Sequence, residues 1–365
     1  MRPRSTGGVG VSTVAATRRI GVVRDELFLD HEAPGYHPEC PERLSAILGA
    51  IDAAPIGRRV RPFAARPATA AELERAHDGG YVRRALDALA QGSGYFDPDT
   101  YFSSGTRAAA LGAVGGCLDA AQALVQGEIE LAFGAVRPPG HHATRRSAMG
   151  FCIFNNIAVT AAGLLAAGTE RILIFDFDVH HGNGTQDIFW KDPRVLFISC
   201  HLWPHYPGSG LPMELGEGPG RGYTINLPFP QGTGNAEYRS TVEELVEPLA
   251  QRFEPQAVLV SAGYDGHRDD PLGGLTLDED GYRMMGGRLR QIADRHANGR
   301  LMFFLEGGYN LEALAASVVA TLEGAAAGAA AADAVARVPV EQQLPRAREV
   351  LGATITLARQ FWPGL

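Results

Sequence analysis

Six short apolar segments recur along this 365-residue chain, and polar or glycine-rich residues follow each of them directly. They are residues 19–23, 131–136, 171–175, 194–199, 257–261 and 301–305. Longer stretches with helical spacing and helix-favouring residues lie between them, at 104–126, 152–167, 235–253 and 278–297. Continuous apolar strands that alternate with helices are typical of a parallel sheet covered on both faces. The pattern predicts an α/β fold with a central parallel β-sheet flanked by helices on both faces.

The domain organisation follows from length and from the ends of the chain. A chain of this length could form one large α/β domain or two ordinary ones. No boundary or internal repeat is evident after residue 18, so we expect a single domain over 19–365. Residues 1–18 are basic but lack the apolar core of a secretion signal, which predicts a disordered leader, with a targeting segment as the alternative. Residues 324–337 and 346–362 are predicted to form helices.

Composition excludes several classes of function. The formal net charge of -8 disfavours direct binding to nucleic acid, which usually requires a basic surface. No apolar run approaches the roughly 18 residues of a membrane helix. The four cysteines are scattered without a CxxC pair, so neither a disulfide framework nor a thiolate zinc site is indicated. We expect a protein of the reducing cytoplasm.

The segment IFDFDVHHGNG, residues 174–184, places carboxylates and imidazoles directly after a predicted buried strand. Buried charges are costly unless a metal, a partner or a transferable proton compensates them. Asp176, Asp178 and His180 lie two residues apart, so in an extended backbone their side chains share one face. Asp178 and His180 plus one further carboxylate would supply three ligands and an open position, which is the arrangement of a catalytic metal site.

Asp265 is the predicted third ligand, because it lies between glycines just past the apolar segment 257–261. A divalent cation held by these three side chains would polarise a carbonyl oxygen and acidify a bound water. Other reactive side chains also follow predicted strands, and the carboxyl ends of parallel strands form the edge where open α/β sheets bind ligands. They are His141, His142, Cys200, His201 and Tyr309.

Proton transfer is the role predicted for the tandem His141–His142, since imidazole titrates near neutral pH. A carboxylate such as Asp176 could orient one of the two rings and raise its pKa, and Asn183 could hold the other with less charge. Tyr309, in a glycine-rich turn, could donate a hydrogen bond to a developing oxyanion. Together these residues predict a metal-assisted hydrolase of an amide or ester.

Each residue taken alone has an ordinary structural explanation. A single histidine at a strand end is more often a hydrogen-bonded loop residue than a ligand, and we assign His31, His77, His267 and His296 to that class. The hydrolase interpretation therefore rests on five polar segments at five successive strand ends. No HExxH, GxSxG or P-loop lysine motif points to another chemistry.

Five sequence blocks, taken together and in order, resemble the zinc-dependent histone deacetylase family, which includes bacterial acetylpolyamine amidohydrolases. The blocks are RPPGHHA (137–143), GFCIFNNIA (150–158), DFDVHHGNGTQ (176–186), SAGYDGHRDDPLGG (261–274) and EGGYN (306–310). HPECPERL (37–44) and YPGSG (206–210) also fit, and the likeness spans roughly residues 19–320. The resemblance implies the arginase/deacetylase-type fold.

The resemblance also implies a role for each matching residue. Asp178, His180 and Asp265 would bind zinc, with Fe2+ as the alternative metal. His142 would be the general base and acid, and His141, paired with Asp176, its electrostatic neighbour. Tyr309 would polarise the acyl carbonyl. Gly150, Phe151, Tyr206 and Leu272 would line a tunnel for the methylene chain of an acyl-lysine.

A structural potassium ion is implied as well, held by Asp176, by the Ser199 hydroxyl and by backbone carbonyls that include the one of Cys200. A second potassium site would involve Phe189, Asp192, Val195 and Tyr223, although Asp192 departs from the hydroxyl residue usual there. Asn183 and HPECPERL are similar to the class II-like branch of the family.

The implied reaction is the hydrolysis of an N-ε-acyl-lysine amide in a peptide or protein. Leu272 stands where polyamine-selective relatives carry an acidic residue, which favours acyl-lysine over acetylpolyamines or other small acylated amines. Two further alternatives stay open: a two-metal manganese enzyme of the arginase type, and a non-enzymatic reader of acyl-lysine. No nucleic acid or membrane partner is expected, and assembly into a homo-oligomer is left open.

Overall fold

The computed structural model describes residues 18–334 and 337–365, and its centre is an eight-stranded sheet in which every pair of neighbours is parallel. The strand order is β2-β1-β5-β10-β9-β6-β7-β8. The strands are β1 (Ile20–Val23), β2 (Val60–Phe63), β5 (Leu131–Gly134), β6 (Ile172–Asp176), β7 (Val195–Leu202), β8 (Thr224–Phe229), β9 (Ala257–Ala262) and β10 (Leu301–Leu305). The predicted parallel sheet is confirmed.

The six predicted apolar segments all form strands, and the two outermost strands are the ones that the sequence pattern missed. β2 (VRPF) and β8 (TINLPF) each contain a proline, which cannot donate to a ladder and is tolerated at sheet edges. A short antiparallel hairpin of β3 (Gly94–Tyr95) and β4 (Tyr101–Phe102) lies outside the sheet and was also missed. One position is corrected: Cys200 and His201 lie within β7 rather than after it, because the strand continues to Leu202.

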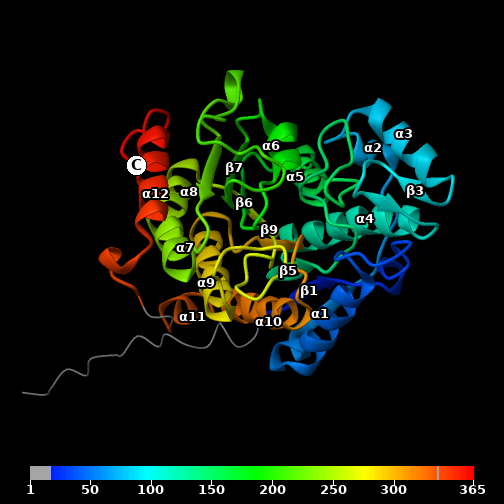
Figure 1. The fold of residues 1–365 in the computed structure, drawn as a ribbon, viewed down its shortest axis with the longest axis horizontal. Coiled ribbons are helices and arrows are strands. Elements are labelled where there is room, and N and C mark those ends of the chain that lie inside the picture. The colour runs from blue at the N-terminus through cyan, green and yellow to red at the C-terminus, as the bar shows by residue number, and fades with distance from the viewer. Residues whose placement is uncertain (1–17, 335–336) are drawn as a thin grey trace, which may run out of the picture.

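Helices cover both faces of the sheet (Figure 1). On one face α4 (Thr106–Val125) contacts β1 and β5, and α5 (Asn156–Ala166) packs beside it. On the other face α9 (Glu279–His296) contacts β9 and β10, and α10 (Leu311–Ala327) packs between α9 and α1 (Pro41–Ala53). The remaining helices are α2 (Ala70–Leu73), α3 (Gly79–Leu89), α6 (Asn183–Phe189), α7 (Asn235–Thr241), α8 (Glu247–Phe253), α11 (Ala329–Ala334) and α12 (Pro345–Ala358).

Two details differ from the sequence-based expectations, and one expectation falls outside the described residues. The predicted helix 235–253 is divided into α7 and α8 by a π-helical turn at Val242–Val246. Among the described residues, α4 is the one helix long and apolar enough to cross a membrane; 72% of its most apolar window is buried inside the protein, as in core helices of many soluble proteins. The expected leader falls, apart from Arg18, outside the described residues.

One cluster of buried apolar side chains extends from Ile20 in β1 to Ala358 in α12. Both faces of the central strands contribute to it, since every residue of β5, β6, β9 and β10 is buried. The charged side chains that follow these strands are therefore held against a rigid core, and this fixes the geometry at the carboxyl edge of the sheet.

Candidate active site

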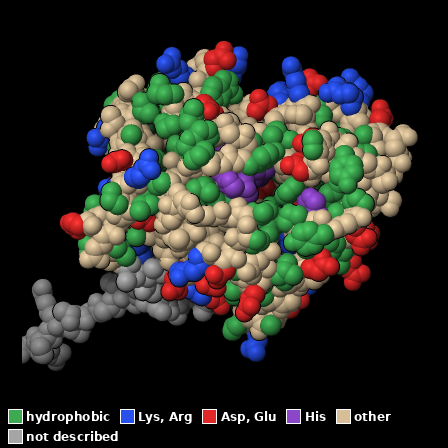
Figure 2. All heavy atoms as spheres, in the orientation of Figure 1, with side chains coloured by type: hydrophobic (Ala, Val, Ile, Leu, Met, Phe, Trp, Pro, Cys, Tyr) green, Lys and Arg blue, Asp and Glu red, His purple; other side chains and the backbone are tan. Residues whose placement is uncertain are grey.

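A narrow cavity of about 230 Å³ lies among the loops that follow the strands. Figure 2 shows histidine side chains in a hollow on this face of the molecule. Eight of the residues predicted for the site line the cavity: His141, His142, Gly150, Phe151, His180, Tyr206, Leu272 and Tyr309. Tyr206 and Leu272 are each 37% exposed, whereas His142 is only 4% exposed, so the former two lie near the mouth and the latter near the bottom.

Asp178, His180 and Asp265 converge beside this cavity, because β6 and β9 are neighbours in the sheet. One ligand atom from each residue lies within 4.8 Å of those of the other two. The Nδ1 atom of His180 is 3.0 Å from Oδ1 of Asp178 and 3.2 Å from Oδ2 of Asp265. All three side chains are buried or nearly so. The structure therefore brings together the three residues that the sequence predicted as ligands of one metal ion.

The donor set fits a divalent cation. Oδ2 of Asp265 is buried and has no hydrogen-bond partner among the described residues, although carboxylates are costly to bury unpaired. Burial, followed by the charge of Asp178, raises the pKa of Asp265 to about 7. Burial lowers the pKa of His180, but a hydrogen bond to Asp178 and the charge of Asp265 outweigh it and raise that pKa to about 10. The cluster thus favours a positive charge at its centre, and two carboxylates with one imidazole leave room for a further ligand.

His141 is paired with a carboxylate. Its Nδ1 lies 3.0 Å from Oδ2 of Asp176, the last residue of β6, and both side chains are buried. Oδ1 of Asp176 accepts the N–H of Asp178 at 3.1 Å, which orients the carboxylate. Burial alone would lower the pKa of His141, but the charges of Asp176 and Asp178 raise it to about 10. His141 is therefore a cation at neutral pH.

His142 is paired with an amide instead. Its Nδ1 lies 2.8 Å from Oδ1 of Asn183, at the start of α6. Burial, followed by the positive charge of His141, lowers the pKa of His142 well below its ordinary value. The two rings lie with their centroids 4.0 Å apart. His142 is consequently a neutral imidazole that can accept a proton, and Asn183 rather than Asp176 is its partner.

Glu306 positions the histidine loop, a role that the sequence reasoning missed. Its Oε2 accepts the N–H groups of Gly140 at 2.7 Å and of His141 at 3.0 Å, and Ser261 donates to its Oε1. Burial is the main reason that its pKa is raised to about 7. A glutamate directly after the buried strand β10 is the same signal that singled out Asp176, so the pattern could have identified it.

Gly150 and Phe151 form one wall of the cavity. A Cβ atom on Gly150 would lie 2.5 Å from Cδ2 of His142, so only glycine lets the imidazole sit there. Phe151 has a φ of 68°, which is strained for an aromatic residue, and its N–H donates to Oγ1 of Thr100. Its ring lies edge-on to that of Tyr309 at 6.2 Å. The strained backbone presents an aromatic face to the cavity.

Tyr206 and Leu272 complete the wall near the mouth. The Tyr206 ring is perpendicular to that of His142, with centroids 5.1 Å apart. Five cavity residues were not predicted for the site: Asp99, Pro139, Cys152, His205 and Gly307. Asp99, between β3 and β4, reads in the sequence as part of an ordinary turn. His205 stacks on His180 with ring centroids 4.8 Å apart, and its position beside Tyr206 was the available signal.

Tyr309 lines the same cavity as the two histidines and comes from the loop after β10. Burial, followed by the nearby charge of Asp265, raises its pKa well above the ordinary value, so the hydroxyl keeps its proton and can donate it in a hydrogen bond. A Cβ atom on the preceding Gly307 would overlap Oδ2 of Asp265. The glycine is thus required for the tyrosine loop to approach the carboxylates.

The residues expected around potassium lie next to the site. Asp176 and Ser199 are in register on β6 and β7. The Ser199 hydroxyl lies 2.9 Å from Nδ1 of His201, and the carbonyl of Cys200 accepts from the Tyr238 hydroxyl at 3.3 Å.

At the second expected potassium position, the Asp192 carboxylate is hydrogen-bonded by the guanidinium of Arg194, at 2.9 Å from Nε and 2.6 Å from Nη2. The side chain that departs from the usual hydroxyl residue therefore already has a cationic partner.

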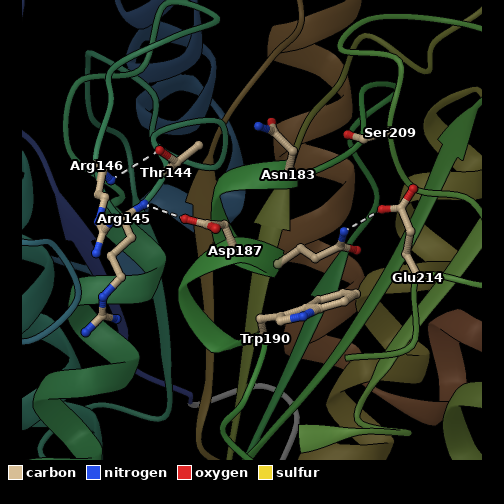
Figure 3. A pocket seen from close by; sticks show the side chains of 9 residues that line it. Thr144, Arg145, Arg146, Asn183, Asp187, Trp190, Ser209 and Glu214 are labelled. Carbon is tan, nitrogen blue, oxygen red and sulfur yellow. Dashed lines mark hydrogen bonds between the residues drawn. The ribbon is translucent and has the colours of Figure 1, made fainter. Parts of the chain in front are cut away.

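A second, more open cleft of about 770 Å³ lies beside α6 (Figure 3). Asn183 is the residue of the predicted site that also lines this cleft. Its lining holds two arginines, Arg145 and Arg146, and two acidic residues, Asp187 and Glu214, so the formal charges balance, and Glu214 accepts from Gln186 at 2.6 Å. The cleft therefore offers neither a net charge nor a convergent pair of acid and base.

Comparisons with known proteins agree with this geometry. A histone deacetylase domain is matched over residues 37–325. A protein of Archaeoglobus fulgidus named "Probable deacetylase" is 43% identical over 294 residues, which is 80% of this chain and 82% of that protein. The "Histone deacetylase-like amidohydrolase" of Pseudomonas aeruginosa is 35% identical over 313 residues, with 80% and 82% of the two chains covered.

A solved structure gives the same answer for the fold. The crystal structure of the HDA15 HD domain superposes with a TM-score of 0.87 and 35% sequence identity, and the match covers 95% of this chain and 96% of the other. The match therefore extends over nearly the whole of both chains.

Proposed function

The chain belongs to the histone deacetylase family of metal-dependent hydrolases, and we propose that it uses zinc to hydrolyse N-ε-acyl-lysine amides in peptides or proteins. One observation carries the proposal. A narrow cavity with aromatic walls leads past a neutral imidazole and a protonated tyrosine to three converging metal-ligand side chains. Such a cavity suits a slender alkyl chain that ends in an amide.

The roles of the buried residues follow from their charges. Asp178, His180 and Asp265 would hold the metal. When bound there, a zinc ion supplies Lewis acidity, which polarises the acyl carbonyl and acidifies water. Zinc is the metal we propose for a set of two carboxylates and one imidazole with an open position, and Fe2+ is the alternative.

His142 would transfer the protons. As a neutral base it takes a proton from the attacking water, and as an acid it returns that proton to the leaving lysine amine. The amide of Asn183 orients the ring without adding a negative charge, which keeps the imidazole a weak base that readily gives the proton up. The cationic His141, compensated by Asp176, contributes a positive charge beside the developing oxyanion.

Tyr309 would stabilise the same oxyanion by a hydrogen bond from its hydroxyl. Removing one such donor typically costs ~10²–10³-fold in kcat. A protein that only read acyl-lysine would not need this donor together with a neutral base, and so their presence in one cavity supports hydrolysis rather than binding alone. A two-metal manganese site would need further bridging carboxylates, and His181 and Gly182 follow His180 instead.

A peptide substrate is supported by the mouth of the cavity. Leu272 is apolar, so no counter-charge to a polyamine ammonium stands at the position where polyamine-selective relatives carry an acidic residue. Asp99 lies at the cavity lining and its carboxylate could accept backbone N–H groups of a bound peptide. We further propose the cytoplasm as the location, and one structural potassium ion near Asp176 and Ser199.

The test compares substrates and metals in one assay. Chelator-treated protein is reloaded with Zn2+ or Fe2+ and given acetyl-lysine peptides, longer acyl-lysine peptides and acetylspermidine. We expect no turnover before reloading, restored turnover afterwards, and a higher kcat/KM on a peptide. A higher kcat/KM on acetylspermidine would make this a small-amine amidohydrolase, and binding of peptide without turnover would make it a reader.

The variant Leu272→Glu tests the selectivity argument directly. A carboxylate at the mouth would attract the distal ammonium of acetylspermidine, so we expect the ratio of kcat/KM for acetylspermidine over peptide to rise by about tenfold, on the scale of a charge-assisted hydrogen bond. Leu272→Gln is the matched neutral control and should leave the ratio nearly unchanged. An equal change in both variants would contradict the electrostatic explanation.

A further inference from the structure

Tyr309 lies in a loop that is packed through the close approach of its glycine backbone to its neighbours rather than through side chains. It follows Gly307 and Gly308, which have no side chains, and Gly308 has a φ of 116°. Regular structure resumes only at α10, whose cap residue Asn310 accepts the N–H of Ala313 at 3.1 Å. The position of the tyrosine therefore depends on what hydrogen-bonds the backbone between Glu306 and Asn310.

On one side of this loop, Arg43 holds the carbonyl groups. Its Nε donates to the carbonyl of Gly308 and its Nη2 to that of Glu306, both at 2.6 Å. Its guanidinium also lies 5.1 Å from the centre of the Tyr309 ring. Arg43 is fully buried, so this side of the loop is fixed by the core.

On the other side, the carboxylate of Asp270 holds the N–H groups. Its Oδ2 accepts from the N–H of Tyr309 at 2.6 Å and from that of Asn310 at 3.1 Å. Its Oδ1 accepts from the N–H of Leu272 at 2.9 Å. A single carboxylate thus joins the tyrosine loop to the residue at the cavity mouth, across two loops that follow neighbouring strands.

We propose that Asp270 is a positioning residue that acts through Tyr309. Hydrogen bonds from N–H groups to a carboxylate are among the stronger ones in proteins, and three of them converge here. Because Leu272 shares the same carboxylate, the mouth of the cavity and the tyrosine hydroxyl keep a fixed separation. That separation sets where an acyl carbonyl meets the hydroxyl. The inference rests on the proposed function, since it assigns Tyr309 a role in turnover.

The neighbouring aspartate provides a matched control. Asp269 is exposed, and the loop uses its backbone carbonyl, which accepts from Nδ2 of Asn310 at 3.0 Å. Among the described residues, its side chain forms one ion-pair contact, with Nδ1 of His267 at 3.8 Å. Asp269→Ala therefore removes a carboxylate of the same loop and leaves the tyrosine loop held.

The experiment is a double-mutant cycle on an acetyl-lysine peptide. We expect Asp270→Ala to lower kcat by roughly 10–100-fold with KM changed less than about twofold, because part of the hydroxyl contribution, ~10²–10³-fold in total, is lost. In a Tyr309→Phe background the same change should lower kcat less than about twofold, since no hydroxyl remains to be positioned. Asp270→Asn, which keeps one acceptor oxygen, should recover part of kcat, and Asp269→Ala should match the wild type.

Two results would overturn the inference: an unchanged kcat in Asp270→Ala, or an equal fold-loss in the presence and absence of the Tyr309 hydroxyl. The zinc content and Tm of each variant identify general damage to the fold, and Asp270→Asn carries the cycle if the alanine variant does not fold. Failure of the proposed function has a different outcome, because the zinc-loaded wild type would then leave the acetyl-lysine peptide unhydrolysed.

Discussion

The two adjacent histidines of the site have the same chemistry and opposite electrostatics. His141 faces the carboxylate of Asp176 at 3.0 Å, and its pKa is raised to about 10 despite burial. His142 faces the amide of Asn183 at 2.8 Å, and burial together with the charge of His141 lowers its pKa well below the ordinary value. A carboxylate partner in one case and an amide partner in the other therefore accompany a raised pKa for His141 and a lowered pKa for His142.

The difference shows how one loop can supply two functions. Neighbouring imidazoles cannot both be charged in a buried site without a large penalty, so the single carboxylate determines which ring keeps the proton. The other ring, held by a neutral amide, stays free to exchange protons. The hydrogen-bond partner of each histidine therefore determines its role, and the presence of two adjacent histidines alone does not.

The largest expected effect on kcat comes from removing the neutral imidazole of His142. His142→Ala should lower kcat by ~10²–10⁴-fold, which is the range of general acid–base catalysis, because the change removes the imidazole to which both proton transfers are assigned. Steady-state assays on an acetyl-lysine peptide measure this, with zinc content and Tm as controls. An unchanged kcat would remove His142 from the proposed reaction.

A smaller effect on kcat is expected from neutralising Asp176, the carboxylate partner of His141. Asp176→Asn replaces a charge-assisted hydrogen bond worth ~1.5–3 kcal/mol, which corresponds to about 10–100-fold in kcat if His141 loses its charge. The same assay applies, with KM expected to change little. A loss below about twofold would mean that the charge on His141 contributes nothing to turnover.

Giving His142 a carboxylate partner, as His141 has, should shift the dependence of activity on pH rather than abolish activity. Asn183→Asp gives His142 a carboxylate, and an adjacent opposite charge raises the pKa of an imidazole by at least about one unit. The acidic limb of the profile of kcat/KM against pH should move upward by that amount. Asn183→Gln is a neutral comparison that should leave the limb in place, and an equal shift in both variants would contradict the electrostatic account.

An effect on stability alone, with no loss of activity, is expected at a buried histidine that has no carboxylate partner. Nδ1 of His77 lies 2.9 Å from the carbonyl of Thr144, and Nε2 accepts the N–H of Asn155 at 2.9 Å, which requires a neutral ring. Burial lowers the pKa of His77 to about 4, below the ordinary 6.5 of the unfolded chain. Its stabilising contribution is therefore complete above about pH 6.5 and is lost as the pH falls towards 4.

Urea unfolding at several pH values measures how the contribution of His77 to stability depends on its protonation. Relative to a His77→Gln variant, which can keep both hydrogen bonds, the wild type should lose roughly 2–3 kcal/mol of unfolding free energy between pH 8 and pH 4.5. Equal losses in the two proteins would show that His77 is protonated equally in the folded and unfolded states.

Much of the sheet and the ligand group could be predicted from sequence, for a physical reason. A strand buried on both faces must be apolar along its length, and charges at its end stand out, as in IFDFDVHHGNG. The edge strands β2 and β8 escape this rule because one side faces no neighbour and tolerates proline. Local sequence also could not give the end of β7, where Cys200 and His201 continue a buried strand.

The partners of the site residues were harder to predict than the residues themselves. Which histidine faces Asp176 depends on how the loop after β5 meets the end of β6, and sequence reasoning from the residues alone left this open. Glu306 and Asp270 act by accepting backbone N–H groups from other loops, so their roles depend on tertiary geometry. Asp99 enters the cavity from a distant hairpin for the same reason.

The central claim is that Asp178, His180 and Asp265 hold one divalent cation beneath the cavity. Metal analysis of chelator-treated protein reloaded with Zn2+, on the wild type and on Asp265→Asn, tests it most directly. We predict one tightly bound equivalent per chain in the wild type and a loss of affinity of at least about tenfold in the variant. Equal, tight binding of zinc by both proteins would contradict the assignment of this site.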